Sequence, residues 1–211
     1  MKKQEVRLTI KEFCTNHSGK MEGMISISTS NLDNTFCAAH KKCEGSICEK
    51  CYANAMCKRY SNLNKKLIAN GLLLKKHDIS IDNMPILNTL ICRIESFGDI
   101  DNTIQVKNYF TLCKANPSTT FAMWTKNPSI IQKAIDELGI EKPNNLIIIL
   151  SSLMLNRTAT VHYDFVDKVF TVYDKEHSDK VTINCGARNC ATCRRCYTKT
   201  TETEYINELL K

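Results

Sequence analysis

Residues 119–152 read TTFAMWTKNPSIIQKAIDELGIEKPNNLIIILSS, and this stretch decides the fold class. Its first part, 119–125, is rich in aromatic and β-branched residues, as strands are. Its last part, 144–152, contains a continuous apolar run, which is typical of a strand buried on both faces of a parallel sheet. Between them, residues 127–140 carry apolar side chains at helical spacing, with a proline in the first turn and a glycine at the end. The stretch predicts a strand, a helix and a second strand.

The same alternation extends over most of the chain. The pattern predicts strands at 23–29, at the end of 86–95, and at about 158–163, 168–173 and 180–184. It also predicts one or two helices over 52–77, a helix over 101–116 with Asp101 as N-cap, and an amphipathic helix over 198–211. We therefore expect an α/β fold in one domain, 1–211, with a mostly parallel sheet and alternating helices. Periodicity leaves open whether this sheet forms a partial (βα) barrel.

The twelve cysteines are the second informative feature of the sequence. The first residues, MKKQEVRLTIKEF, lack the apolar run of a signal peptide, and no apolar stretch approaches the length of a membrane span. We therefore expect a cytoplasmic protein. In a reducing compartment, clustered cysteines are more often metal ligands or redox groups than disulfides.

The C-terminal cysteine loop, 185–196, has the clearer spacing. It carries Cys185, Cys190, Cys193 and Cys196 in the pattern C-x4-C-x2-C-x2-C. Four thiolates can hold a tetrahedral zinc ion or a cubane iron-sulfur cluster. Three cysteines that are each two residues apart resemble a ferredoxin run, whereas zinc sites usually pair two separated knuckles. The spacing favours an iron-sulfur cluster and leaves zinc as the alternative.

The first cysteine loop, 37–57, holds more thiols than one site needs. Cys43, Cys48 and Cys51 form the densest triplet, and Cys37 or His40 is a candidate fourth ligand. If only three cysteines bind a cubane, its fourth iron is open to a substrate or cofactor; if Cys37 closes the site, the cluster is structural or transfers electrons. Four further cysteines are interpreted as ordinary buried thiols, namely Cys14, Cys57, Cys92 and Cys113.

Polar residues that follow predicted strands are candidates for binding a cofactor or substrate. Arg93, Glu95 and Asp99 surround a strand end, and Lys126 follows the next strand. Ligands of α/β proteins usually bind at this carboxyl edge of the sheet. The alternative is that these residues cap turns and helices.

The net charge of +7 permits contact with polyanions, but the basic residues are spread along the chain. Nucleic acid is therefore a weakly supported partner. An electron-transfer partner or a small-molecule substrate suits the cysteines better, and no membrane partner is expected.

Several segments together resemble a known family. CEGSICEKCYA (43–53), RIESFGDI (93–100), FAMWTKNPSI (121–130) and the terminal four-cysteine run are similar to the phage gene 88 protein family, which occurs in phages and prophages. The resemblance spans about residues 23–197 and implies a phage or prophage protein.

A more distant resemblance is to radical S-adenosylmethionine enzymes. Those enzymes carry three cysteines after the first barrel strand, and their cluster binds the cofactor S-adenosylmethionine; here the triplet 43–51 also follows a predicted strand. Its spacing is C-x4-C-x2-C rather than C-x3-C-x2-C. The leading hypothesis is thus a protein with two 4Fe-4S clusters in redox or radical chemistry on an unknown substrate. The alternative is a zinc-stabilised, non-catalytic binding module, so enzyme activity stays open.

Overall fold

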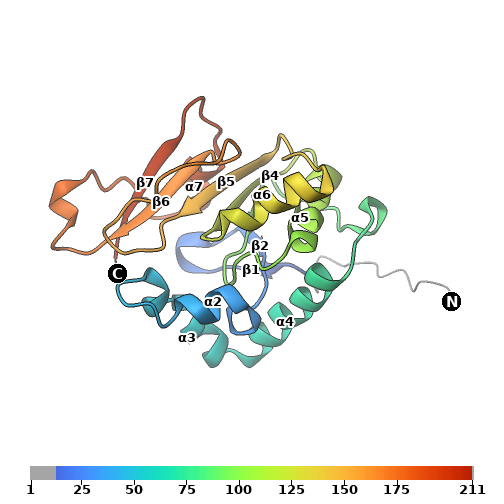
Figure 1. Ribbon diagram of the computed structural model, residues 1–211, viewed down its shortest axis with the longest axis horizontal. Coiled ribbons are helices and arrows are strands. Elements are labelled where there is room, and N and C mark those ends of the chain that lie inside the picture. Colours follow the sequence, from blue (N-terminus) through green and yellow to red (C-terminus); the bar gives the residue numbers. More distant parts are fainter. Residues whose placement is uncertain (1–12, 211) are drawn as a thin grey trace.

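The computed structural model describes residues 13–210, and this part of the chain contains a seven-stranded sheet whose strands lie in consecutive order (Figure 1). The strands are β1 (Thr15–Asn16), β2 (Ile25–Ile27), β3 (Ile91–Ile94), β4 (Thr120–Thr125), β5 (Leu146–Ser151), β6 (Lys168–Tyr173) and β7 (Glu204–Leu209). Only β1 is antiparallel to its neighbour. The predicted α/β fold with a mostly parallel sheet is confirmed, and the sheet is open, with β1 and β7 at its edges. The charged segment 1–12 lies outside the described residues.

Helices alternate with the central strands. They are α2 (Thr35–His40), α3 (Tyr52–Arg59) and α4 (Ser61–Lys76) between β2 and β3, α5 (Thr103–Ala115) between β3 and β4, and α6 (Pro128–Leu138) between β4 and β5. As predicted, α6 begins at a proline and ends at Gly139, whose left-handed φ of 60° suits glycine. No helix in residues 13–210 has the length and apolar character that a membrane crossing requires.

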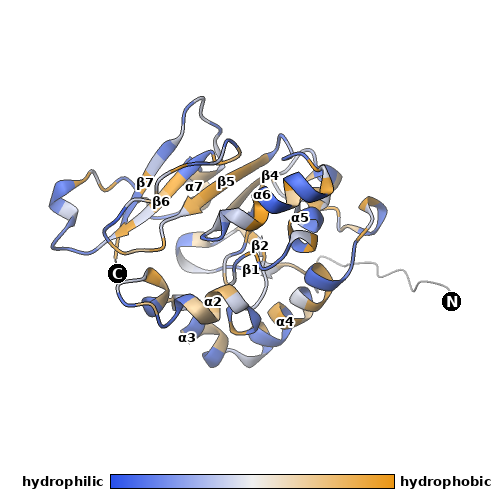
Figure 2. Cartoon of the chain, viewed as in Figure 1, coloured by the Kyte–Doolittle hydropathy of each residue, from blue (hydrophilic) through white to orange (hydrophobic). Residues whose placement is uncertain are grey.

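The two faces of the sheet pack against different parts of the chain. In β4, Phe121 and Met123 join the core formed with α4, α5 and α6, whereas Ala122 and Trp124 face the other side. All six residues of β5 are buried, and the strand is coloured as hydrophobic in Figure 2. The second face is covered by the C-terminal cysteine loop, which includes α7 (Cys190–Cys193) and η6 (Arg195–Tyr197). One cysteine loop thus crosses the face of the sheet that α4–α6 leave uncovered.

The predicted C-terminal helix over 198–211 is wrong. Residues Glu204–Leu209 form β7, which pairs in parallel with β6. Because β7 is an edge strand, its Ile206 is its only buried side chain, so the sequence lacks the clean alternation of a half-buried strand. The spacing of its apolar residues resembles a helix instead.

Two predicted strands and one predicted cap are also wrong. Residues 158–163 form no strand; they run over the helical face, where Val161 and Tyr163 pack against the core. Residues 180–184 likewise form no strand. The N-cap of α5 is Asn102, whose side chain accepts from the Gln105 N–H, and not Asp101.

Candidate functional site

The N-terminal thiol group comprises Cys37, Cys43, Cys48 and Cys51, all in the connection that follows β2. Cys37 lies in α2, where its N–H donates to the Asn34 side chain at 2.8 Å. That side chain also donates to the backbone oxygen of Asp99 at 2.8 Å, so it joins α2 to the loop after β3. The group is therefore held at the carboxyl edge of the sheet.

The other end of this loop is anchored beyond β5. Cys48 lies in the short 3-10 helix η3 (Ile47–Lys50), which Ser46 caps by accepting from the Cys48 N–H at 3.0 Å. Ser46 forms a β-bridge with Met154, and the Ile47 N–H donates to the Leu153 oxygen at 2.9 Å. The thiol-bearing loop thus extends over the ends of the strands from β2 to β5.

Three charged side chains lie close enough to these thiols to change their pKa values. Burial raises the pKa of the Cys37 thiol, Asp99 and Glu95 raise it further, and Lys126 opposes them. Burial also raises the pKa of the Cys48 thiol, which Lys126 again opposes. Three of the four residues predicted at the carboxyl edge, Glu95, Asp99 and Lys126, therefore lie near the N-terminal thiols.

Cys43 and Cys51 are both half-buried. Cys51 interacts electrostatically with Cys48 and also with Cys57, which lies buried in α3 as the sequence indicated. The Cys43 thiol is directed to the Glu44 backbone oxygen at 4.0 Å. His40, the other candidate fourth ligand, has its Nδ1 at 2.9 Å from the Phe36 oxygen.

Glu95 is the best-enclosed carboxylate of this edge. It is 3% exposed and has a left-handed backbone φ of 56°, which is strained for a residue other than glycine. Its Oε1 accepts from Tyr109 (2.5 Å), Gln105 (2.7 Å) and Thr29 Oγ1 (2.9 Å), and its Oε2 accepts from the Thr29 N–H (3.1 Å). Burial nevertheless raises the pKa of Glu95 to about 7.

Asp99 is held in a similar way. It is 3% exposed and accepts from Thr125 Oγ1 at 2.6 Å, from the Ile100 N–H at 2.8 Å and from the Lys126 N–H at 2.9 Å. Burial raises the pKa of Asp99. These contacts place two buried carboxyl groups and one lysine beside the N-terminal thiols, an arrangement that can move a proton or orient a polar ligand.

The raised pKa of Glu95 predicts that stability falls as pH rises from about 4.5 to 7. In this window the folded chain retains a proton that the unfolded chain releases, so ionisation favours unfolding by about 3.5 kcal/mol. Denaturant unfolding across pH measures this slope. We expect Glu95→Gln to flatten it and the exposed Glu137→Gln to leave it unchanged. A slope that is as steep in Glu95→Gln as in the wild type contradicts the assignment, since Asp99 accounts for only part of it.

The C-terminal thiol group comprises Cys185, Cys190, Cys193 and Cys196. Asn189 caps α7 by accepting from the Thr192 N–H at 3.1 Å, and the Cys185 N–H donates to the Asn207 oxygen of β7 at 3.0 Å. Burial raises the pKa of the Cys196 thiol to about 12, and the other three cysteines each contribute electrostatically to its pKa. The other three thiols therefore lie within electrostatic range of Cys196.

Arg93, the fourth residue predicted at the carboxyl edge, belongs to this second group. It lies in β3 on the face that the C-terminal loop covers, and its guanidinium stacks on Trp124 at 4.0 Å from the ring centroid. Its charge lowers the pKa values of Cys190 and Cys196. Its Nε is buried and has no hydrogen-bond partner among the described residues.

The donor sets of both groups fit a thiophilic metal. Thiolates select zinc, copper(I) and iron-sulfur clusters. The unpartnered Arg93 Nε beside Cys190 and Cys196 fits an acceptor such as a thiolate or sulfide sulfur. As they stand, no three cysteine, histidine or carboxylate side chains within 13–210 are placed to hold a metal ion, so binding requires the loops to draw together.

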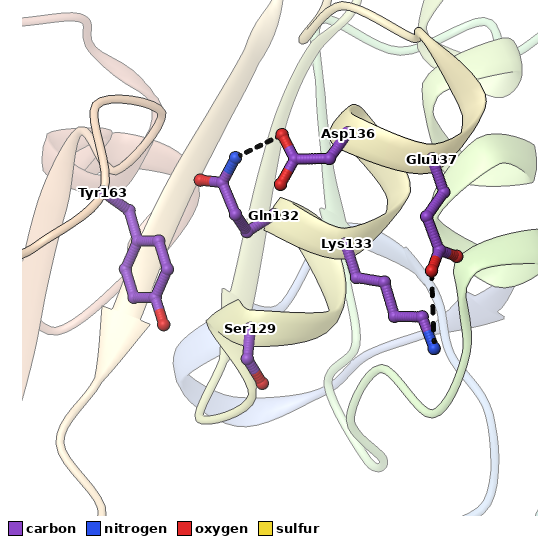
Figure 3. A pocket seen from close by; sticks show the side chains of 6 residues that line it. All are labelled: Ser129, Gln132, Lys133, Asp136, Glu137 and Tyr163. Carbon is purple, nitrogen blue, oxygen red and sulfur yellow. Dashed lines mark hydrogen bonds and ion pairs between the residues drawn. The ribbon is translucent and has the colours of Figure 1, made fainter.

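A shallow pocket beside α6 contains none of these residues (Figure 3). Its polar side chains pair with one another, Gln132 with Asp136 at 2.8 Å and Lys133 with Glu137 at 3.8 Å. The other lining residues are Ser129 and Tyr163. The chemistry-bearing residues therefore lie elsewhere.

These features define a class of protein, an α/β protein with an open, mostly parallel sheet that carries two groups of cysteines. The model of the protein family described as Gene product 88 matches residues 2–205 of this chain. The chain therefore belongs to this phage protein family. No curated protein matches the sequence, and no solved structure matches it.

Proposed function

We propose that this chain is an iron-sulfur protein with two cubane clusters, which acts in redox chemistry in the host cytoplasm. The C-terminal cluster is held by Cys185, Cys190, Cys193 and Cys196. The N-terminal cluster is held by Cys43, Cys48 and Cys51, with Cys37 as the fourth ligand. The single observation that carries this proposal is that one loop, packed on the sheet through Cys190 and Cys196, brings Cys185 and Cys193 within electrostatic range of Cys196.

Cys37 as fourth ligand is supported by its position beside Cys48. Four protein ligands leave an iron-sulfur cluster without an open iron, which suits electron transfer to a partner or a small-molecule substrate. The bound clusters supply one-electron chemistry. The buried carboxyl groups of Glu95 and Asp99 and the half-buried Lys126 supply polar groups next to the N-terminal cluster.

The visible spectrum of anaerobically purified protein tests this function. We expect a brown protein whose broad sulfide-to-iron absorption bleaches when dithionite reduces it. A colourless protein whose spectrum dithionite leaves unchanged contradicts the proposal and favours the alternative, a zinc-stabilised binding module.

A second candidate is a radical S-adenosylmethionine enzyme, and one observation favours it. Strands β2 to β7 are parallel and consecutive, and the N-terminal thiols follow the first of them, as the resemblance to those enzymes implies. In this second candidate, Cys43, Cys48 and Cys51 alone hold the N-terminal cluster.

Addition of S-adenosylmethionine separates the two candidates. With Cys37 as fourth ligand, we expect no change in the electron paramagnetic resonance spectrum of the reduced protein and loss of one cluster in Cys37→Ala. A shifted spectrum, with both clusters retained in Cys37→Ala, contradicts the closed site and supports the radical enzyme.

A further inference from the structure

Two basic side chains adjoin the C-terminal thiol group, and both come from distant parts of the sequence. Lys20 lies in the 3-10 helix η1 (Gly19–Met21), and its ammonium donates to Cys185 Sγ at 3.3 Å and to Glu208 at 2.6 Å. Its charge also lowers the pKa of Cys190. One ammonium therefore touches this group directly.

Arg93 reaches the C-terminal thiol group from strand β3 of the sheet. Its register neighbours are Ser26 in β2 and Ala122 in β4, both of which have small side chains. Trp124 supports the guanidinium, and Arg93 Nη1 donates weakly to Met21 Sδ at 3.4 Å. Among the described residues, Arg93 forms no ion pair, and its Nε lacks an acceptor.

Arg93 is half-buried, and its buried Nε has no acceptor among the described residues, which indicates a missing negative charge. Arginine presents five N–H donors, and an unmade buried hydrogen bond is costly. Four thiolates around a cubane carry a net negative charge that increases on reduction, and the charge surrounding a cluster and the hydrogen bonds to its sulfurs set its reduction potential. A cation at this position therefore favours the reduced form.

The N-terminal thiol group has different charged neighbours from the C-terminal thiol group. Lys126 is its nearby cation, but the buried carboxyl groups of Asp99 and Glu95 oppose Lys126 at the Cys37 thiol. At the C-terminal group, the carboxylate of Glu208 is already paired with Lys20. The N-terminal group therefore has a cation of its own, separate from Lys20 and Arg93.

We propose that Lys20 and Arg93 compensate the charge of the C-terminal cluster and raise its reduction potential. This inference rests on the proposed function. Both residues are positioning and tuning residues: neither ligates the iron, and each acts through hydrogen bonds and charge at the cysteine sulfurs. The inference assigns to Arg93 an electrostatic role at the C-terminal cluster rather than ligand binding at the carboxyl edge.

Anaerobic redox titration of the iron-loaded chain tests the assignment. The C-terminal cluster is identified as the wave that disappears in Cys196→Ala. At a fixed potential, we expect Arg93→Met to increase its oxidised-to-reduced ratio tenfold, which equals about 59 mV for a one-electron couple. Lys20→Met shifts it in the same direction, and Arg93→Lys, which keeps the charge, shifts it less.

Lys126→Met is the matched control, because Lys126 faces the other thiol group. It should lower only the remaining wave. The inference is overturned if Arg93→Met and Lys20→Met bind iron as the wild type does and leave the C-terminal wave unchanged. A wild-type protein without iron overturns the proposed function itself, which is a distinguishable result.

Discussion

Gly98→Ala is expected to destabilise the protein by about 3 kcal/mol, because no space exists for a side chain at this position. An added Cβ would lie 2.7 Å from the Thr29 backbone oxygen, 2.8 Å from Thr29 Oγ1 and 2.9 Å from Glu95 Oε2. The backbone oxygen cannot rotate away. Thr29 and Glu95 are also buried and bonded to each other, so relief of the clash breaks the network that encloses the Glu95 carboxyl group.

Gly71→Ala is the matched control for this substitution. Gly71 lies inside α4, and its added Cβ would make only ordinary contacts, the nearest at 3.7 Å from Lys75. Replacement of a helical glycine by alanine stabilises by about 0.5–1 kcal/mol. Urea denaturation of both variants measures the difference. Equal stability of Gly98→Ala and the wild type would contradict the close approach of β2 and the loop after β3.

Cys196→Ala is expected to remove roughly half of the iron, since each cubane holds about four iron atoms and this variant loses one of two ligand sets. Cys196 is the most informative position because its thiol interacts with the other three of its group. Iron and sulfide per folded chain measure the loss, with the N-terminal cluster as the internal reference.

Cys113→Ala controls for the loss of a thiol as such. Cys113 is fully buried in α5, in the core between the helices and the sheet, and is remote from both thiol groups in the fold. We expect this variant to retain all of its iron. Full iron in Cys196→Ala, or an equal loss in both variants, would contradict the C-terminal ligand set.

The sequence predicts the central part of the fold well. In β4, α6 and β5 the strand, cap and helix signals are local and agree with one another, and the structure follows them within a few residues. The peripheral elements were harder to predict. Residues Glu204–Leu209 form a strand because the edge of β6 is available to pair with them, and no short-range pattern records that edge.

Some residues of the candidate site could likewise be predicted from the sequence, and others could not. Strand ends placed Glu95, Asp99 and Lys126 at one edge, as general rules for parallel sheets imply. Arg93 could not be separated from them, because the face on which a strand residue lies depends on what covers that face, here a loop a hundred residues later. Lys20 and the Glu95 partners Thr29 and Tyr109 carried no signal in the sequence, since tertiary structure alone brings them there.

The central claim is that the cysteines hold iron-sulfur clusters, and metal analysis of the anaerobically purified chain tests it most directly. We expect about eight iron atoms and about eight acid-labile sulfides per chain, with little zinc. Stoichiometric zinc without iron or sulfide would contradict it and would identify the two thiol groups as structural zinc sites.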